Sequence, residues 1–312
     1  MAKANTANIQ PKKDKNRLIM RIKRHIPFYL MIMPVVIFFL LFSYGPMLNV
    51  DIAFRKFHPM FGKQEWVGLE NFARLLTTPK FLTTLGNTLS ISLVNLFLNM
   101  LLSVVFALML NEVTNVFFKR AVQTAVYLPH FLSWVVVASI FIMVLSPNTG
   151  FTGPIYEMLG ITPENPLTNS RLWRVIYHAI NAWKSFGYGA IVYLAAITGI
   201  DPVLYEAASI DGAGKWKQTM HITLPALTGT MLVVLILNLS KVLNVFDSVF
   251  VLQNPLVYGV SDVLGTYTYR LGLVERDYSF ATAVGLFRSF VAAVLIFISN
   301  YASKRIRGRG II

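Results

Sequence analysis

The chain contains no cysteine, so neither a disulfide bond nor a thiolate redox or metal site can form. Charged residues are also scarce, at 13% of the 312 residues, whereas an average soluble domain has roughly 25%. Hydrophobic residues make up 55% of the sequence. This length would suit two soluble domains, but the shortage of charge argues instead for one membrane-embedded domain.

Long stretches without Asp, Glu, Lys or Arg indicate how the chain crosses the membrane. Three of them, 26–50, 81–111 and 121–156, exceed the roughly 20 apolar residues that a bilayer-spanning helix needs. Three further apolar stretches carry only a few charges each. We therefore predict an all-α, polytopic membrane protein with six transmembrane helices. Their expected positions are about 28–48, 87–110, 122–145, 175–199, 230–252 and 279–302.

The net charge of +14 is concentrated at the two ends of the chain. Lys and Arg cluster in residues 1–26 and again in residues 303–312. Together with loops 112–121 and 201–226, these tails hold more basic residues than the opposite loops. The positive-inside rule therefore places both termini and the 201–226 loop in the cytoplasm. Without a nucleic-acid-binding motif, the charge fits the lipid bilayer surface and predicts no nucleic-acid partner.

The sequence divides into four segments. A basic tail, 1–26, precedes the first transmembrane helix and an external segment, 27–82, whose 49–86 portion we expect to form a short folded loop. The main transmembrane domain spans 83–302, and a basic tail, 303–312, follows it. Within the main domain, we expect residues 112–121 to form a tight cytoplasmic hairpin between the second and third spans.

The most informative polar stretch is 201–226, between the fourth and fifth spans. Asp201 is a suitable N-cap for a short helix that begins near Pro202 and continues to Ile210. Gly212 and Gly214 permit backbone angles closed to other residues. A second short helix is expected over 215–222, stopped by Leu224 and Pro225. Two short helices at an angle suit docking into a groove of another protein, whereas an ordinary polar connector would not need these residues at these spacings.

The spacing of Glu206-Ala207-Ala208, Gly212, Ile222 and Leu224-Pro225 resembles the EAA signature of permeases from ATP-binding-cassette importers. Other residues resemble the polysaccharide and oligosaccharide branch of the carbohydrate-uptake permeases, and the resemblance covers about 26–305. They are Gly68-Leu-Glu-Asn-Phe72, Asn87-Thr88, Asn254-Pro255, Tyr267-Thr-Tyr-Arg270, Asp277-Tyr278 and Ala283-Val-Gly-Leu-Phe287.

The resemblance implies a type I importer fold in a bacterial inner membrane and the import of an oligosaccharide. It also implies four partners: a second homologous permease, two ATPase subunits and an extracytoplasmic solute-binding protein. The implied ATPase-coupling residues are Glu206, Ala207, Ala208, Asp211, Gly212, Ile222, Leu224 and Pro225.

A nucleotide site in this chain is not supported. Gly214-Lys215 could belong to a phosphate-binding loop only with glycine five residues before Gly214 and Ser or Thr after the lysine. Ser209 and Trp216 occupy those positions. The scattered histidines lack metal-ligand spacing, and no pair of carboxylates suits acid–base catalysis. We therefore expect a transport subunit that is no enzyme and holds no cofactor, with ATP and magnesium bound by a partner ATPase.

Three basic residues, Lys184, Lys241 and Arg288, fall inside predicted spans. A charge at the bilayer centre costs at least about 2.5–3.5 kcal/mol, so each should face protein or water. The basic surplus suggests an acidic, uronate-containing oligosaccharide as cargo. In the other interpretation, these residues pair with the partner permease or cap broken helices. The candidate substrate path comprises Asn181, Lys184, Asn238, Lys241, Asn244 and Asp247.

Three alternative functions remain open on the sequence. An ion-coupled secondary transporter would need no ATPase, but it should carry coupling carboxylates in its spans, where Asp247 stands alone. A membrane-embedded enzyme would need a nucleophile–base or metal constellation. A permease of the same class for a non-sugar solute, such as amino acids or phosphate, would share the 201–226 loop.

Overall fold

The computed structural model describes residues 23–148, 150–160 and 164–307, so most of the first predicted basic tail and half of the second lie outside the described residues. The chain forms two compact units, 1–51 and 52–312. In the first unit, α2 (Ile26–Phe39) continues through a π-helical turn (Leu40–Tyr44) into α3 (Gly45–Met47). Within this unit, no residue of α2 is buried.

The second unit begins with the expected folded external loop. Strands β1 (Arg55–His58) and β2 (Gly62–Trp66) pair antiparallel, with Arg55 opposite Trp66 and His58 opposite Gly62. The short helix α4 (Glu70–Thr77) follows, and its Asn71 side chain donates to the carbonyl of Ala53 at 2.9 Å. A short folded loop is present as expected, but it ends earlier than the predicted 49–86, because α5 begins at Pro79.

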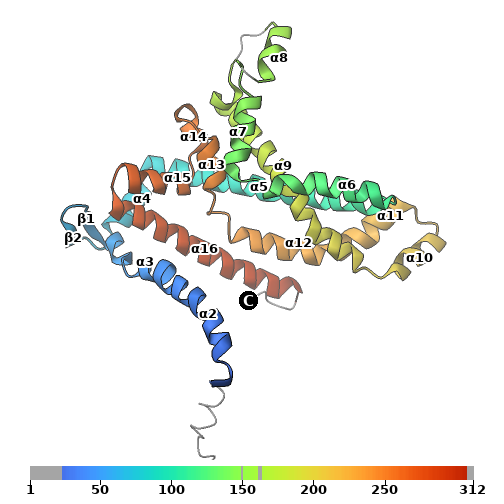
Figure 1. The fold of residues 1–312 in the computed structure, drawn as a ribbon, viewed down its shortest axis with the longest axis horizontal. Helices are drawn as coiled ribbons and strands as arrows, with labels where there is room; N and C mark the ends of the chain where they lie inside the picture. Colours follow the sequence, from blue (N-terminus) through green and yellow to red (C-terminus); the bar gives the residue numbers. More distant parts are fainter. Residues whose placement is uncertain (1–22, 149, 161–163, 308–312) are drawn as a thin grey trace, which may run out of the picture. The chain divides into compact units, whose positions relative to one another are not determined.

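Two long helices, α5 (Pro79–Glu112) and α9 (Ser170–Thr198), pack side by side and form the centre of the second unit (Figure 1). The 34 residues of α5 give it a length of about 51 Å, more than the hydrocarbon core requires. Helix α6 (Val116–Tyr127) begins directly after the N-cap Asn115, whose side chain accepts from Phe118 N. The connection is therefore residues 113–115 alone, and the expected 112–121 loop was too long, because the cap starts the helix early.

The third span is broken, which corrects the expected continuous helix over 122–145. After α6, a 3-10 turn (Leu128–Phe131) leads into α7 (Trp134–Val144), and the two parts are bent by 101°. Pro129 removes one backbone donor at the break, and Ser133 caps α7 by accepting from Val136 N. Beyond α7 lie α8 (Thr152–Met158) and a 3-10 turn (Pro166–Thr168), and Asn169 then caps α9.

The loop after α9 is helical, as predicted. Helix α10 (Pro202–Ile210) is bent by 70° from α9, and the Asp201 carboxylate accepts from Val203 N at 3.0 Å. Helix α11 (Lys215–Gln218) continues through a π-helical turn (Thr219–Thr223) into α12 (Leu224–Leu239). The expected stop at Leu224-Pro225 is therefore wrong. The wider π-helical turn directly before Pro225 accommodates its ring, and the helix runs unbroken for 25 residues.

The fifth span also differs from the expected 230–252. Its helix ends at Leu239, and a non-helical segment, 240–246, separates it from α13 (Asp247–Leu252). This break contains neither glycine nor proline. Three short helical segments follow, namely a 3-10 turn (Pro255–Val257), α14 (Tyr258–Ser261) and α15 (Leu264–Tyr269). After a π-helical turn (Arg270–Val274), α16 (Tyr278–Arg307) forms the last span.

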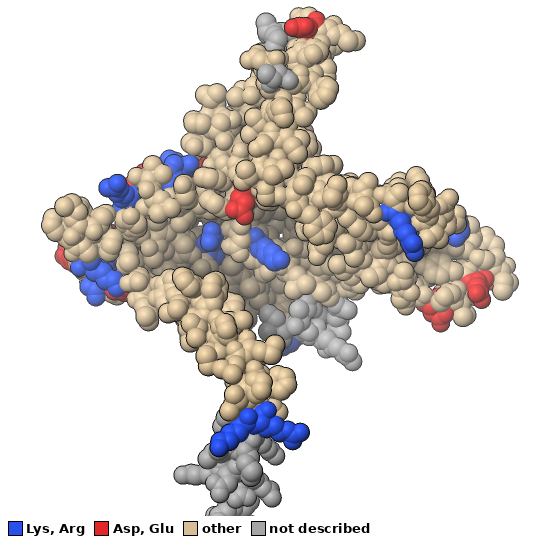
Figure 2. Space-filling view, in the orientation of Figure 1, with Lys and Arg blue, Asp and Glu red and all other residues tan. Residues whose placement is uncertain are grey.

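In the described part of the chain, four helices are long and apolar enough to cross a membrane, and two bent pairs bring the number to as many as six. This agrees with the six predicted spans, although the third is bent. Figure 2 shows that charged side chains are sparse between the two ends of the second unit, and that acidic side chains gather at the end where α10 lies.

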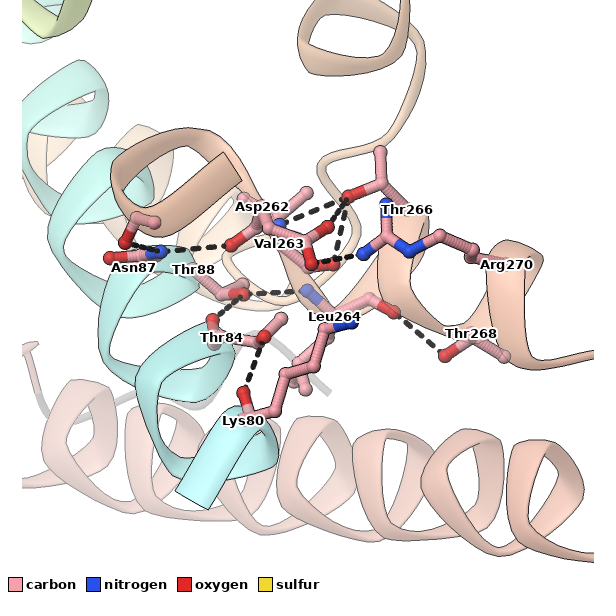
Figure 3. A network of polar contacts seen from close by, with 11 residues as sticks. Lys80, Thr84, Asn87, Thr88, Asp262, Val263, Leu264, Thr266, Thr268 and Arg270 are labelled. Atoms are coloured by element: carbon pink, nitrogen blue, oxygen red, sulfur yellow. Dashed lines mark hydrogen bonds and ion pairs between the residues drawn. The ribbon is translucent and has the colours of Figure 1, made fainter. Parts of the chain in front are cut away.

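A buried polar network joins the first half of α5 to α15 and the segment before it (Figure 3). The amide of Asn87 donates to the carbonyls of Gly259 and Asp262, both at 3.1 Å. Thr88 accepts from Leu264 N at 2.8 Å, and the carboxylate of Asp262 forms an ion pair with Arg270. The network fixes the segment before α16 against α5 through polar contacts.

Candidate functional site

A cleft of about 650 Å³ opens between α5, α9 and the end of α12, with His130 contributed by the break in the third span. Apolar residues such as Leu96, Met100 and Val234 form part of its wall. The rest is polar but nearly free of charge. Its polar and aromatic lining residues are Ser92, Asn95, Asn99, Ser103, His130, Asn181, Ser185, Tyr188, Tyr193, Asn238 and Lys241.

The contribution of α5 is a polar stripe along one helix face. Ser92, Asn95, Asn99 and Ser103 follow one another at intervals of three or four residues, so they lie above one another on the same side. None of these four residues belongs to the predicted substrate path, although small polar residues at helical spacing in an apolar span are a signal visible in the sequence. Their alignment gives the cleft a row of amide and hydroxyl groups.

Three hydrogen bonds hold this stripe against α9. Asn95 Oδ1 and His178 Nδ1 are 2.7 Å apart, and Asn99 Nδ2 donates to Asn181 Oδ1 at 2.9 Å. Ser103 Oγ donates to the carbonyl of Phe186 at 2.8 Å. The helices approach closely here, because a Cβ atom at Gly189 would lie only 2.4 Å from Ser103 Oγ. Small residues and interhelical hydrogen bonds of this kind stabilise helix pairs in membranes.

Some polar groups around the cleft lack a partner. Asn99 Oδ1, His130 Nδ1 and Tyr193 OH are buried without a hydrogen bond, within the part of the chain that the structure describes. The His130 and Tyr188 rings stack in parallel, with centroids 3.9 Å apart and an interplanar angle of 3°. These three atoms are inaccessible from the cleft, whose surface combines other hydroxyl and amide groups with flat aromatic rings, the two features that a sugar ring can contact.

The break after α12 contributes Lys241, the only charged residue among the described residues that line the cleft. Lys241 is exposed, and its ammonium group forms no ion pair with any described residue. Asn238 lines the cleft beside it, and its amide donates to the carbonyl of Val234 at 2.9 Å. Asn244 lies in the same break, and Asp247 is the first residue of α13; both are exposed, but neither lines the cleft. A free cation therefore faces a largely neutral polar surface.

Lys184 has a different environment from Lys241. It is only 7% exposed and lies outside the cleft lining. Its ammonium group donates to three carbonyls at the break in the third span, those of Pro129 at 3.2 Å, His130 at 2.8 Å and Leu132 at 2.6 Å. Lys184 therefore caps a broken helix, as in the second interpretation of the sequence. Arg288, which is partly buried in α16, does not line the cleft either.

The predicted coupling residues lie together on the α10–α12 loop, at the opposite end of α12 from Lys241. Gly212 has a φ angle of +76°, so the turn needs a residue without a side chain, whereas Gly214 has an ordinary φ of −69°. The Trp216 side chain is 72% exposed and that of Ile210 is 87% exposed. Exposed among the predicted set are Glu206, Ala207, Asp211, Gly212 and Pro225, and partly buried are Ala208, Ile222 and Leu224.

Large apolar side chains beside exposed carboxylates make this loop suitable for docking another protein. Val203 and Leu204 add to the exposed apolar surface of α10, and Glu206 lies on the same helix. Lys215 forms an ion pair at 3.5 Å with Glu112 at the end of α5. Both partners are exposed, so the pair orients the loop more than it stabilises it.

Comparisons with known proteins show the family of the chain. Residues 99–308 match the family model of binding-protein-dependent transport system inner membrane components. The chain is 40% identical to the polygalacturonan/rhamnogalacturonan transport system permease protein YteP of Bacillus subtilis, over 99% of this chain and 98% of that protein. It is 30% identical to the arabinooligosaccharides transport system permease protein AraP of the same species, over 90% of each chain.

Solved structures show the same fold. The chain resembles a subunit of a bacterial ABC transporter involved in the import of the acidic polysaccharide alginate, with a TM-score of 0.84 and 40% identity over 93% of this chain and 99% of that one. A second structure contains the alginate transporter in complex with a periplasmic protein bound to an alginate pentasaccharide, and it matches with a TM-score of 0.84 and 39% identity over 95% and 100% of the two chains.

Proposed function

The chain belongs to the family of inner membrane components of binding-protein-dependent transport systems, and we propose that it conducts an acidic oligosaccharide through an ATP-driven importer. One observation carries this proposal. Helix α11 of the exposed loop is the beginning of the helical segment 215–239. Asn238, near the other end of this segment, and Lys241, two residues after it, form a wall of the cleft. A protein that moves the loop would therefore also move the wall of the cleft.

The energy source follows from the docking surface. The chain has no phosphate-binding loop, while Ile210 and Trp216 present apolar surface next to exposed carboxylates. Two ATPase subunits would supply ATP hydrolysis, and one of them would bind α10 and α11 in a groove on its own surface. Closure of the ATPase pair would shift the spans between two packings that open the cleft to opposite sides. In this arrangement, both termini and the α10–α12 loop are cytoplasmic.

A second permease and a solute-binding protein complete the proposed assembly. The cleft is open to the surface, and α12 and α16 keep most of their apolar surface unburied, with 11% and 17% of their most apolar stretches buried. A homologous permease facing this side would close the path and exclude lipid from it. A solute-binding protein on the outer side would deliver the oligosaccharide, as the complex of the alginate transporter with its periplasmic protein suggests.

The cargo is proposed from the charge of the cleft. Lys241 presents an unpaired cation beside amides and the His130–Tyr188 stack, so the surface can pair with a carboxylate while contacting sugar rings and hydroxyls. A similar transporter imports an acidic polysaccharide, and a similar permease belongs to a polygalacturonan/rhamnogalacturonan system. Uronate-containing oligosaccharides are therefore the proposed substrate class.

The first test concerns the ATPase contact. Glu206→Lys places a cation on the exposed face of α10, and we expect the permease to lose its co-purifying ATPase while the spans remain folded. Glu65→Lys on the external hairpin, which is also exposed, serves as the matched control and should leave association unchanged. Uptake that continues without ATP would instead support the secondary transporter and overturn the proposal.

The second test concerns the cargo. Uptake into proteoliposomes is compared for neutral and uronate-bearing oligosaccharides of equal length, with the wild type and with Lys241→Gln. We expect the wild type to prefer the uronate and the variant to lose that preference by about tenfold, the size of one charge-assisted contact. Preference of the wild type for the neutral sugar would refute the acidic cargo and leave the ATPase coupling untouched.

A further inference from the structure

The helical segment 215–239 has a weak point next to the loop formed by α10 and α11, residues 201–218, which we call the docking loop. Its first turn, α11, is followed by the π-helical turn Thr219–Thr223, and Pro225 lies immediately beyond. A π-helical turn and a proline both interrupt the regular hydrogen-bond ladder and mark places where a helix bends. Without a brace, a force applied to α10 and α11 would therefore tend to bend the segment here and would be lost before the cleft.

Two hydrogen-bonded contacts brace this weak point from α10. Gln218 is only 6% exposed, and its side-chain amide donates to Ser209 Oγ at 2.9 Å and to the carbonyl of Ala213 at 3.0 Å. The hydroxyl of Tyr205 lies 2.9 Å from Thr223 Oγ1, which is buried within the π-helical turn. One contact precedes the π-helical turn and the other lies at its end, so α10 spans it like a splint.

We propose that Gln218, supported by the Tyr205–Thr223 contact, is the positioning residue that makes the docking loop and α12 move as one body. The proposal rests on the proposed function, because it assigns to Gln218 the transmission of ATPase movement to the cleft. The resemblance to the EAA signature involves Glu206, Gly212, Ile222 and Pro225 and does not include Gln218. Gln218 is buried beneath the loop surface, so it acts by joining α10 to α11 and not by contacting the ATPase.

The geometry gives this transmission a definite path. At 1.5 Å per residue, the 25 residues of the segment extend about 37 Å from Lys215 to Leu239, two residues before Lys241. A splinted segment carries a displacement of the loop to this end, whereas a segment that bends at the π-helical turn absorbs it. Loss of the splint should therefore separate ATP hydrolysis from transport while leaving the docking surface intact.

The test uses the complete transporter in proteoliposomes, with permease pair, ATPases and solute-binding protein. Gln218→Ala with Tyr205→Phe removes both contacts, and Thr219→Ala is the matched control, because its hydroxyl bonds only within its own helix, to the carbonyl of Lys215. We expect ATPase association and basal hydrolysis to match the wild type. Stimulation of hydrolysis by loaded binding protein and uptake should both fall about tenfold, a typical allosteric coupling factor.

A rescue experiment distinguishes transmission from simple loss of structure. The chain has no cysteine of its own, so Ser209→Cys with Gln218→Cys introduces the only pair of thiols in the permease. This variant should be uncoupled, and a short bifunctional thiol reagent that joins the two positions should restore stimulation and uptake. Restored coupling supports the splint, because a chemical link replaces the hydrogen bond without recreating it.

Two results would overturn the inference. Unchanged stimulation in the Gln218→Ala/Tyr205→Phe variant would show that the segment does not need the splint. Loss of ATPase association to the extent seen with Glu206→Lys would show that Gln218 shapes the docking surface itself. A wild-type complex whose hydrolysis is not stimulated by loaded binding protein would instead contradict the proposed function, so the two failures are distinguishable.

Discussion

The buried ion pair between Asp262 and Arg270 offers a quantitative test of how the segment before α16 is held. Asp262 is 3% exposed, and the Arg270 side chain is 16% exposed. The Thr266 hydroxyl donates to Asp262 Oδ1 at 2.7 Å, and the Arg270 guanidinium lies 4.6 Å from the centre of the Tyr258 ring. Asp262→Asn preserves the shape of the side chain and its acceptor for Thr266. It removes the anion that faces Arg270.

The size of the effect follows from the burial of both partners. Removing one partner of a buried pair costs about 3–5 kcal/mol, because the remaining charge stays desolvated. Arg270 has no second carboxylate partner among the described residues, and its Nε atom already lacks a hydrogen bond. We therefore expect Asp262→Asn to lower the free energy of unfolding by about 4 kcal/mol, within that range. Adding Arg270→Met removes the stranded charge and should recover at least half of the loss.

The free energy of unfolding is measured by titration with a denaturing detergent in mixed micelles, for the wild type, both single variants and the double variant. Arg74→Gln is the control, because the Arg74–Asp277 pair is also short, at 2.7 Å, but its side chains are 52% and 29% exposed. It should cost no more than about 1 kcal/mol. A loss of that size for Asp262→Asn, or additive losses in the double variant, would refute the reasoning.

Two further predictions use the same titration. Lys184→Met leaves three carbonyls at the break in the third span without their charged donor and should cost about 3 kcal/mol, whereas Lys241→Met, which has no such partners, should change stability by less than about 0.5 kcal/mol. Gly187→Ala places a Cβ atom 2.3 Å from the carbonyl of Val126 and should cost about 1–3 kcal/mol, whereas Gly285→Ala meets open space and should be neutral or slightly stabilising. Equal effects within either pair of variants would contradict the packing described.

Local sequence signals predicted the features that depend on neighbouring residues. The number of spans followed from uncharged stretches, and the start of α10 followed from Asp201 as a cap and Pro202 in the first turn. Gly212 was expected to allow an unusual backbone angle, and its φ of +76° confirms this. In each case, the residues that determine the structure are adjacent in the chain, so a sequence pattern can reveal them.

The breaks in the third and fifth spans were missed because distant residues stabilise them. Carbonyls freed at 129–132 are satisfied by the ammonium group of Lys184, more than 50 residues away. In the fifth span, the carbonyl of Val242 accepts from the hydroxyl of Ser92 on α5. At Pro225 the sequence predicted the end of a helix that in fact continues, because the π-helical turn before the proline allows it to do so.

The cleft shows the same limit for individual side chains. Lys184 and Lys241 are both lysines within apolar spans, and sequence alone gave them the same interpretation. Only the fold shows that the ammonium group of Lys184 donates to three carbonyls, while Lys241 faces the cleft. The stripe that includes Asn95 and Asn99 was recognisable from its spacing, but it lies in a stretch, 81–111, that has no charged residue to mark it, unlike the spans of Asn181 and Asn238.

The break in the fifth span has a consequence for how the cleft can change shape. Ser92 on α5 holds the carbonyl of Val242, and Val242 and Leu243 are buried in a cluster with Phe81 of the same helix. Lys241 therefore lies between two attachments, α12 on one side and α5 on the other. A displacement of α12 along its axis cannot move the buried residues of the break as far as it moves Leu239. The strain must be taken up within 240–246. The ammonium group of Lys241 would therefore move relative to the amide groups of the α5 stripe. As a result, the distance between this cation and the amides in the cleft would change with the position of the α10–α12 loop.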